Sequence, residues 1–271
     1  MTIQPRSAPN PWRLIRFVLP VLSWLISALP LVTTAAEDVP HPLSQQAQDE
    51  IKKTQTDRIE KLSQQIAENP KSEDLYSQRG DACFFLGQFD KAVADYDEMV
   101  KLNPASEASH WRRGIACFYA DKFKNAAAQF EMYHSFDDVD RENGIWRYLS
   151  QYMAQGRDPA RQGLLKYKKD DREPFPAVYQ LFAGKITPEE ILKQIGEAEI
   201  DDQERQKRLF YAELYIGLNY AVEQNPEKAL PHLRAATANS WPRKAGFGPH
   251  YMWQVGRLHY ERLIQKQKKP S

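Results

Sequence analysis

The sequence has almost no excess of charge of either sign. Its 271 residues contain 37 Lys and Arg against 36 Asp and Glu, a formal net charge of +1. Proteins that bind nucleic acid through its backbone present a strongly basic surface, so this composition argues against a nucleic-acid partner. With 42% hydrophobic and 27% charged residues, the chain can bury a sizeable core and is not a disordered polyelectrolyte.

The sequence also lacks the short motifs of common enzymes. It has no His-Glu-x-x-His, no Gly-x-Ser-x-Gly and no Gly-x-x-x-x-Gly-Lys-Ser/Thr, the patterns of zinc proteases, serine hydrolases and phosphate-binding loops. The acidic run 137–144 resembles a calcium loop. Counted from Asp138, however, its Gly is one place late and Leu149 stands where a bidentate Glu is required. We expect no catalysis, no metal and no cofactor, and interpret this run as the cap of the next helix.

Segments that alternate apolar and polar residues over the length of a strand are missing as well. Residues 47–69 instead carry Ile51, Ile59, Leu62 and Ile66 at helical spacings of 3, 4 and 8, and Asn69-Pro70 is a helix stop signal. The sequence therefore predicts an all-α fold.

The amino terminus is basic and then apolar. Arg6, Arg13 and Arg16 precede the uncharged stretch 17–36, which ends in Thr-Thr-Ala-Ala. This pattern predicts a secretory signal peptide, residues 1–36, cleaved after Ala36 or Ala35. The alternative is an uncleaved anchor, because twenty uncharged residues can span a membrane. We expect an exported protein of the periplasm or cell envelope that touches the membrane only if this segment is kept.

After a polar lead-in, residues 37–45, one sequence pattern occurs twice. "GDACFFLGQFDKAVADY" at 80–96 is followed 34 residues later by "GIACFYADKFKNAAAQF" at 114–130. The two units are counted from Glu73 and from Glu107. Small residues at positions 8 and 20 of each unit would let two helices approach closely, while larger ones at positions 11 and 24 fill the space beside them. In positional order the residues are Gly80, Cys83, Ala92 and Tyr96, then Gly114, Cys117, Ala126 and Phe130; a unit from Phe210 adds Gly217, Tyr220 and Ala229.

This 34-residue pattern resembles the tetratricopeptide repeat (TPR), a helical hairpin that stacks into a solenoid because one hairpin cannot hide its own apolar face. A worn unit at 146–167, a hairpin at 176–195 capped by Thr187-Pro188-Glu189-Glu190, and a closing helix from Pro249 to Ile264 complete a predicted helical domain, 46–265. Residues 266–271 are a basic tail predicted to fray.

This order of elements resembles the NlpI-type TPR lipoproteins of the bacterial envelope. The resemblance implies a scaffold without catalysis that docks envelope proteases and peptidoglycan hydrolases. That family is tethered through a lipidated cysteine, and this chain has no cysteine near the predicted cleavage site. The alternative function is that of a membrane-anchored structural subunit of a secretion or envelope-assembly complex. The sequence leaves open whether the protein forms a homodimer.

The two cysteines occupy the same position in consecutive units. Their side chains should be parallel and on helices about 8–10 Å apart, which does not suit a disulfide. We therefore predict two buried thiols.

In the TPR architecture the first helix of each unit lines a concave face. The groove residues so predicted to bind a partner protein or peptide are Phe84, Phe85, Trp111, Ile115, Phe118, Tyr119, Trp146 and Met153. For Phe84 and Phe118, packing in the core is an equal alternative. Ser77, Asp81, Trp111 and Ile115 stand where a carboxylate clamp would need Lys, Arg or Asn, which disfavours such a clamp. Trp241 and Trp253 are assigned to closing the carboxyl-terminal end, with a second docking patch as the alternative.

Overall fold

The computed structural model describes residues 41–268, so the predicted signal segment lies outside the described residues. Residues 41–268 contain no strand, which confirms the all-α prediction, and no helix among them is both long and apolar enough to cross a membrane. The helices are α1 (Gln45–Glu68), α2 (Glu73–Phe85), α3 (Phe89–Leu102), α4 (Trp111–Tyr119), α5 (Phe123–Phe136), α6 (Arg141–Gln155), α7 (Arg157–Gln162), α8 (Phe175–Phe182), α9 (Pro188–Glu197), α10 (Asp202–Val222), α11 (Pro226–Ala238) and α12 (Phe247–Lys268), with a 3₁₀ turn at Pro104–Ser106.

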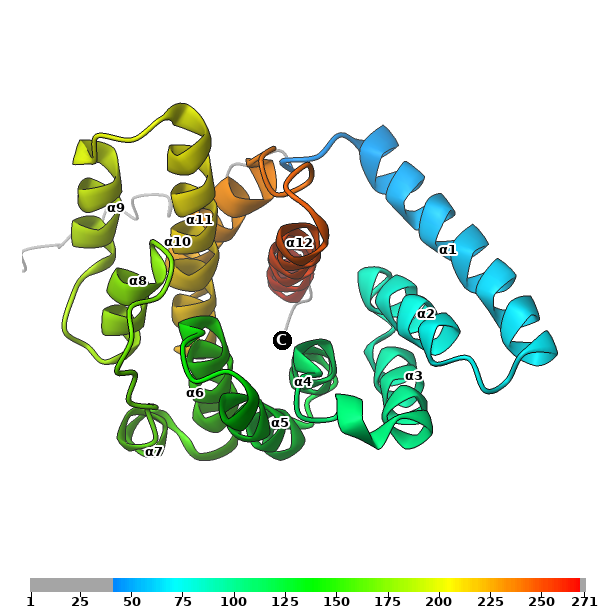
Figure 1. Ribbon diagram of the computed structural model, residues 1–271. Helices are drawn as coiled ribbons and strands as arrows, with labels where there is room; N and C mark the ends of the chain where they lie inside the picture. Colours follow the sequence, from blue (N-terminus) through cyan, green and yellow to red (C-terminus); the bar gives the residue numbers. More distant parts are fainter. Residues whose placement is uncertain (1–40, 269–271) are drawn as a thin grey trace, which may run out of the picture. The chain divides into compact units, whose positions relative to one another are not determined.

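Helices α2 to α11 form consecutive hairpins that stand side by side around α12 (Figure 1). Local signals set their ends. Helix α1 stops at Glu68, directly before Asn69-Pro70. Helix α9 begins after the predicted cap Thr187, which forms a capping box with Glu190. The Asp140 side chain caps α6 by accepting a hydrogen bond from the Glu142 amide, as the acidic run predicted.

The close crossing of paired helices depends on the glycine at position 8. A Cβ placed on Gly80 would lie 2.6 Å from Cε1 of Tyr96, and one on Gly114 would lie 2.6 Å from Cζ of Phe130. In the late hairpin α10–α11, a Cβ on Gly217 would lie 2.7 Å from Cγ of Leu233. The predicted packing of positions 8 and 24 is thus confirmed in three hairpins.

Other parts of the repeat differ from the expectation. Helix α4 begins only at Trp111, after the 3₁₀ turn, and α7 has six residues before the chain leaves the helical path at Gly163. Helix α10 begins at Asp202, eight residues before the predicted start of its unit. Helix α12 continues to Lys268, so residues 266–268 are helical instead of a frayed tail.

The cysteines lie where the repeat predicts. Both thiols are free and buried, on the first helices of two consecutive hairpins. Burial raises the pKa of Cys83 to about 11 and also raises the pKa of Cys117. Two inert buried thiols, and no disulfide between them, are therefore confirmed.

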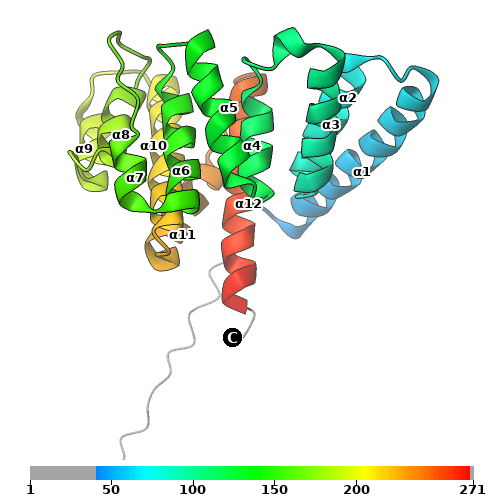
Figure 2. The same ribbon diagram turned by 90° about the horizontal axis from the view of Figure 1, so that it is seen from below.

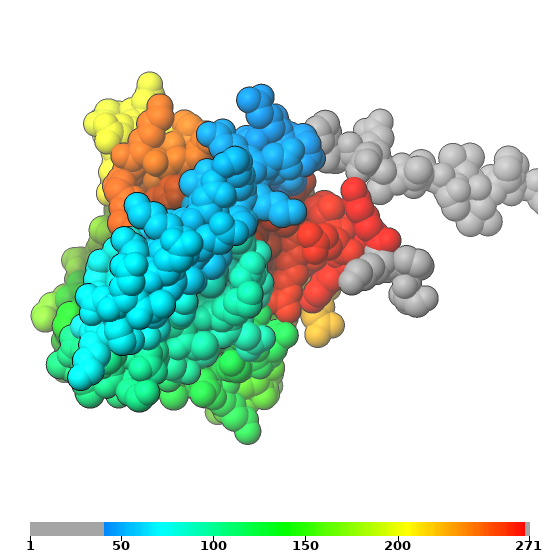
Figure 3. Space-filling model, turned by 90° about the vertical axis from the view of Figure 1, so that its right-hand side faces the viewer, coloured from blue at the N-terminus to red at the C-terminus, as the bar shows by residue number. Residues whose placement is uncertain are grey.

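Helix α1 covers the outer side of the first hairpin by packing on α2 (Figure 3). Leu62 and Ile66 are its buried residues, while most of its polar face is exposed. The segment before α1 meets the far end of the chain, because the His41 ring packs 5.3 Å from the Tyr260 ring of α12. The beginning and the end of the described chain are therefore in contact.

We expect Gly80→Ala to lower the free energy of unfolding by about 1–3 kcal/mol, because the new methyl group overlaps a Tyr96 ring whose hydroxyl is fixed on Asp81. Gly196→Ala is the control, since a Cβ there meets nothing within 4 Å. That variant should be neutral or gain up to about 1 kcal/mol from helix propensity. Urea unfolding followed by circular dichroism measures both. Equal stability of the two variants would contradict the packing role of Gly80.

Candidate functional site

Helix α12 occupies the concave side of the solenoid (Figures 1 and 2). The Tyr251 ring of α12 stacks on Phe84 at 5.0 Å between ring centroids and meets the edge of Trp111 at 5.0 Å. Nη2 of Arg257 donates a 2.6 Å hydrogen bond to the carbonyl oxygen of Phe85. The chain therefore fills much of its own groove.

This arrangement corrects the expectation of an open groove along the first two hairpins. Of the eight predicted groove residues, six are buried: Phe84, Phe85, Ile115, Phe118, Tyr119 and Trp146. Phe84 and Tyr119 contact α12 directly, the latter through a 3.0 Å hydrogen bond between its hydroxyl and Nδ1 of His259. Trp111 is only partly buried. Met153 is 42% exposed and takes no part in the cavity described next.

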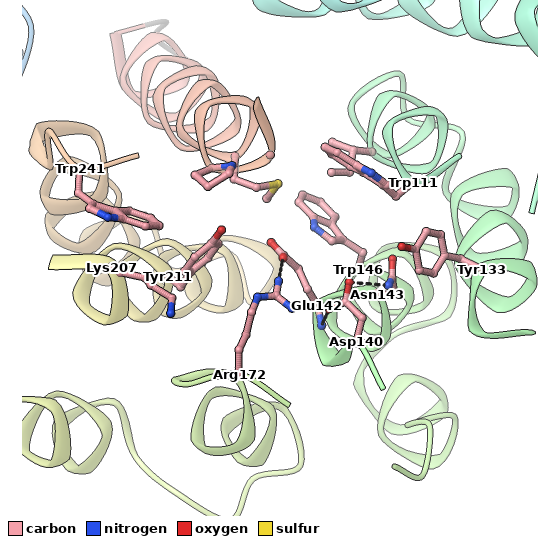
Figure 4. Close-up of a pocket in the computed structure, with 14 residues that line it drawn as sticks. Trp111, Tyr133, Asp140, Glu142, Asn143, Trp146, Arg172, Lys207, Tyr211 and Trp241 are labelled. Carbon is pink, nitrogen blue, oxygen red and sulfur yellow. Dashed lines mark hydrogen bonds and ion pairs between the residues drawn. The ribbon is translucent and has the colours of Figure 1, made fainter. Parts of the chain in front are cut away.

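A pocket of about 420 Å³ remains where α12 begins. Its walls come from α4, α5, α6, α10 and α12, from the Arg172 segment between α7 and α8, and from Trp241 after α11. In Figure 4, Trp111 and Tyr133 lie on one side and Tyr211 and Trp241 on the other, with charged side chains between them. Ile115, Asn143, Trp146, Lys207, Gly248, Pro249 and Met252 complete the lining. The pocket thus combines aromatic walls with a charged floor.

The floor is built around Arg172. Its Nη2 lies 2.6 Å from Oε2 of Glu142, and its Nη1 lies 3.3 Å from Oδ1 of Asp140 and 3.3 Å from Oδ1 of Asp171. The guanidinium lies 4.3 Å above the Phe175 ring, which holds its plane. Three carboxylates therefore share one guanidinium.

Glu142 also takes part in hydrogen bonds with the aromatic core. Its Oε1 accepts a hydrogen bond from the Tyr215 hydroxyl, which in turn accepts one of 3.2 Å from Nε1 of Trp146. Burial raises the pKa of Glu142 to about 7, against the opposing effect of Arg172. Burial likewise raises the pKa of Asp140. Both carboxyl groups therefore keep a proton to a higher pH than they would in water, because their surroundings exclude water.

The chemistry of the lining fits binding. Among the described residues that line the pocket there is no Ser, Thr, Cys or His. Aromatic walls with a few convergent polar groups are the ordinary composition of a ligand site. We therefore treat the pocket as a recognition site.

Sequence reasoning found part of this site. Trp111, Ile115 and Trp146 were predicted groove residues and do line the pocket. For Trp241, end closure was preferred over a docking patch; it lines the pocket and packs on Phe210 and Tyr211. Trp253 is buried, with Nε1 donating to the carbonyl oxygen of Thr237. The lining residues that were missed are Tyr133, Asp140, Glu142, Asn143, Arg172, Lys207, Tyr211, Gly248, Pro249 and Met252.

One signal pointed toward the missed residues. Asp140, Glu142 and Asn143 belong to the acidic run that was interpreted as a helix cap. The predicted groove residue Trp146 follows Glu142 at the i, i+4 spacing. Residues one turn apart share a face of a helix, so this spacing could have placed Glu142 beside Trp146. Arg172 lies in a segment with no regular pattern, and nothing in the sequence marks it.

We expect the stability of the protein to fall relative to Glu142→Gln as the pH rises from 5 to 8. The folded pKa of Glu142, about 7, is above the ordinary value of 4.5, so the folded state keeps a proton that the unfolded state releases. The stabilisation is present below about pH 4.5 and is lost as the pH approaches 7. Between pH 5 and pH 8 the free energy of unfolding should fall by about 2–3 kcal/mol more for the unaltered protein than for Glu142→Gln.

Urea unfolding of both proteins at pH 5 and pH 8 measures this difference. The buried His110 and His259, whose pKa values burial lowers to about 3, affect both proteins alike and cancel. Parallel pH dependence of the two proteins would show that Glu142 ionises in the folded protein as it does in water.

Comparison with known proteins agrees with the helical pattern. The family model of the tetratricopeptide repeat matches residues 73–106, the 34 residues of the first predicted unit and in the same register. No curated protein matches the chain, so no relative supports the narrower resemblance to NlpI-type lipoproteins. TPR units bind other proteins and are generally non-catalytic. The chain therefore contains a tetratricopeptide repeat within an all-helical repeat solenoid, an architecture that serves protein interaction.

Proposed function

We propose that this protein is an exported, non-catalytic adaptor that binds other proteins of the cell envelope through the part of its concave face that α12 leaves open. One observation carries the proposal. On the concave side of a TPR solenoid, where such proteins bind their partners, an accessible pocket of about 420 Å³ is walled by three tryptophans and two tyrosines.

The rest of the concave face is a poorer candidate. Tyr251, Val255 and Tyr260 of α12 are buried, and a partner would have to displace α12 to reach the face that it covers. Trp111 and Trp241, in contrast, are partly exposed at the pocket. Tryptophan is enriched among the hot spots of protein interfaces, where truncation of one side chain costs about 2 kcal/mol or more.

The location of the partner is inferred from the first 36 residues. Their basic region, apolar stretch and small-residue end support export. The resemblance of the element order to NlpI-type lipoproteins supports envelope proteases and peptidoglycan hydrolases as partners. Attachment through a lipid is not part of this proposal, because no cysteine stands near the predicted cleavage site.

The partner-binding role of the pocket can be tested by affinity purification from crosslinked cells. We expect Trp111→Ala with Trp241→Ala to reduce recovery of envelope proteins at least tenfold, because two anchors are removed. Met153→Ala is the matched control, as this exposed apolar side chain lies outside the pocket. Circular dichroism shows whether the double variant is folded. Unchanged recovery by a folded double variant would move the binding site away from the pocket.

Export can be tested by sequencing the amino terminus of the protein purified from the envelope fraction. We expect the mature chain to begin at Glu37 or Ala36, because the small residues before them suit signal peptidase. A chain that retains residues 1–36 and sediments with membranes would instead support the anchored subunit of an envelope complex.

A further inference from the structure

The ion-pair cluster at the pocket carries more negative than positive charge. Asp140 and Glu142, which line the pocket, and Asp171, which does not, all lie within 3.3 Å of Arg172, so three carboxylates share one guanidinium. Lys207 also lines the pocket, but its Nζ lies 2.9 Å from Oε2 of Glu204, which is outside this cluster. The cluster around Arg172 is therefore short of positive charge, which a ligand could supply.

The carboxylates of the floor can accept further hydrogen bonds. The side chains of Glu142 and Asp140 keep 14% and 21% of their surface exposed. Each oxygen of Glu142 accepts one hydrogen bond, from Tyr215 and from Arg172 respectively, whereas a carboxylate has about four acceptor sites. A donor that enters the pocket thus finds unused lone pairs.

The walls favour a flat cation. The faces of tryptophan and tyrosine rings attract cations within about 6 Å of the ring centre, and five such rings line the pocket. The protein already uses this contact elsewhere in the same region, where the Arg243 guanidinium lies 5.3 Å from the Trp253 ring. A guanidinium combines stacking on aromatic rings with a planar set of donors that suits carboxylates, which an ammonium group does not.

Resting on the function proposed above, we propose that the pocket binds the arginine side chain of a partner protein, with its guanidinium between the aromatic walls and its donors on Glu142 and Asp140. The geometry places anions at the floor and rings at the sides, as this ligand requires (Figure 4). The volume of about 420 Å³ exceeds that of one side chain, so residues next to the arginine also enter.

The test uses the purified protein labelled with ¹⁵N and the capped peptide acetyl-Gly-Arg-Gly-amide. The sequence has six tryptophans, whose indole N–H signals are assigned with single Trp→Phe variants. We expect saturable shifts of the Trp111 and Trp241 signals, and at least tenfold weaker binding of the same peptide with citrulline, which keeps the shape of arginine without its charge. The lysine peptide should also bind more weakly.

Variants test whether the Glu142 carboxylate binds the guanidinium of the peptide. Glu142→Gln should weaken binding of the arginine peptide at least tenfold, while Glu199→Gln, an exposed carboxylate beyond α9, should leave it unchanged. If Glu142→Gln does not fold, the comparison of arginine with citrulline on the unaltered protein still decides. Equal binding of the citrulline or lysine peptide, or arginine-dependent shifts confined to other tryptophans, would overturn the proposal. So would tenfold tighter binding of agmatine, which would mark a site for free amines.

The two proposals can fail separately. If envelope proteins are recovered in a manner that depends on Trp111 and Trp241, but the arginine peptide does not bind, the adaptor function stands and the arginine assignment is wrong. If the arginine peptide binds at the pocket but the double variant recovers every protein as before, the pocket recognises arginine and the partner-binding site lies elsewhere.

Discussion

The packing of α12 into the concave side of the solenoid is the contact on which the rest of the structure depends. In this chain the inner face of the stacked hairpins carries several aromatic side chains. Tyr251 covers it by contacting Phe84, Phe85 and Trp111 at once. The aromatic side chains that would be a liability on an open surface become the centre of a continuous core.

The same burial explains the ionic groups inside the molecule. Asp81 is 3% exposed and accepts hydrogen bonds from the Tyr96 hydroxyl and from Arg112. An unpaired charge at such a place would be costly, whereas a paired and hydrogen-bonded one is tolerated. Around Asp140 and Glu142 the pairing is incomplete, and there the structure keeps a pocket open. The fully paired charged groups thus lie in the core, and the incompletely paired ones lie at the candidate site.

How much the sequence could predict follows from the range of each interaction. The register of the repeat, the glycine contacts and the Thr187 cap depend on residues close in sequence, and all were predicted correctly. The position of α12 depends on contacts such as Arg257 with Phe85, 172 residues apart, which no local pattern reveals. The groove residues were therefore identified on the right helices, but their exposure was misjudged.

The site was predicted least well for a related reason. Its aromatic residues on α4 and α6 repeat with the helical units, whereas Arg172 lies in the irregular segment that follows the shortened α7. A pocket whose parts come from seven separate segments is recognisable only once those segments are assembled. The acidic run alone was visible, and a cap was a sufficient explanation for it.

The contact between the last helix and the first hairpin also changes how this repeat protein must fold. A plain solenoid can grow one hairpin at a time, because each unit contacts only its neighbours. Here the cores of α2 and α4 are completed only when Tyr251 and Arg257 of α12 pack against them. Completion of the first hairpins is therefore coupled to α12, and until α12 is available their inner face remains uncovered, in a state in which other apolar segments can bind to it.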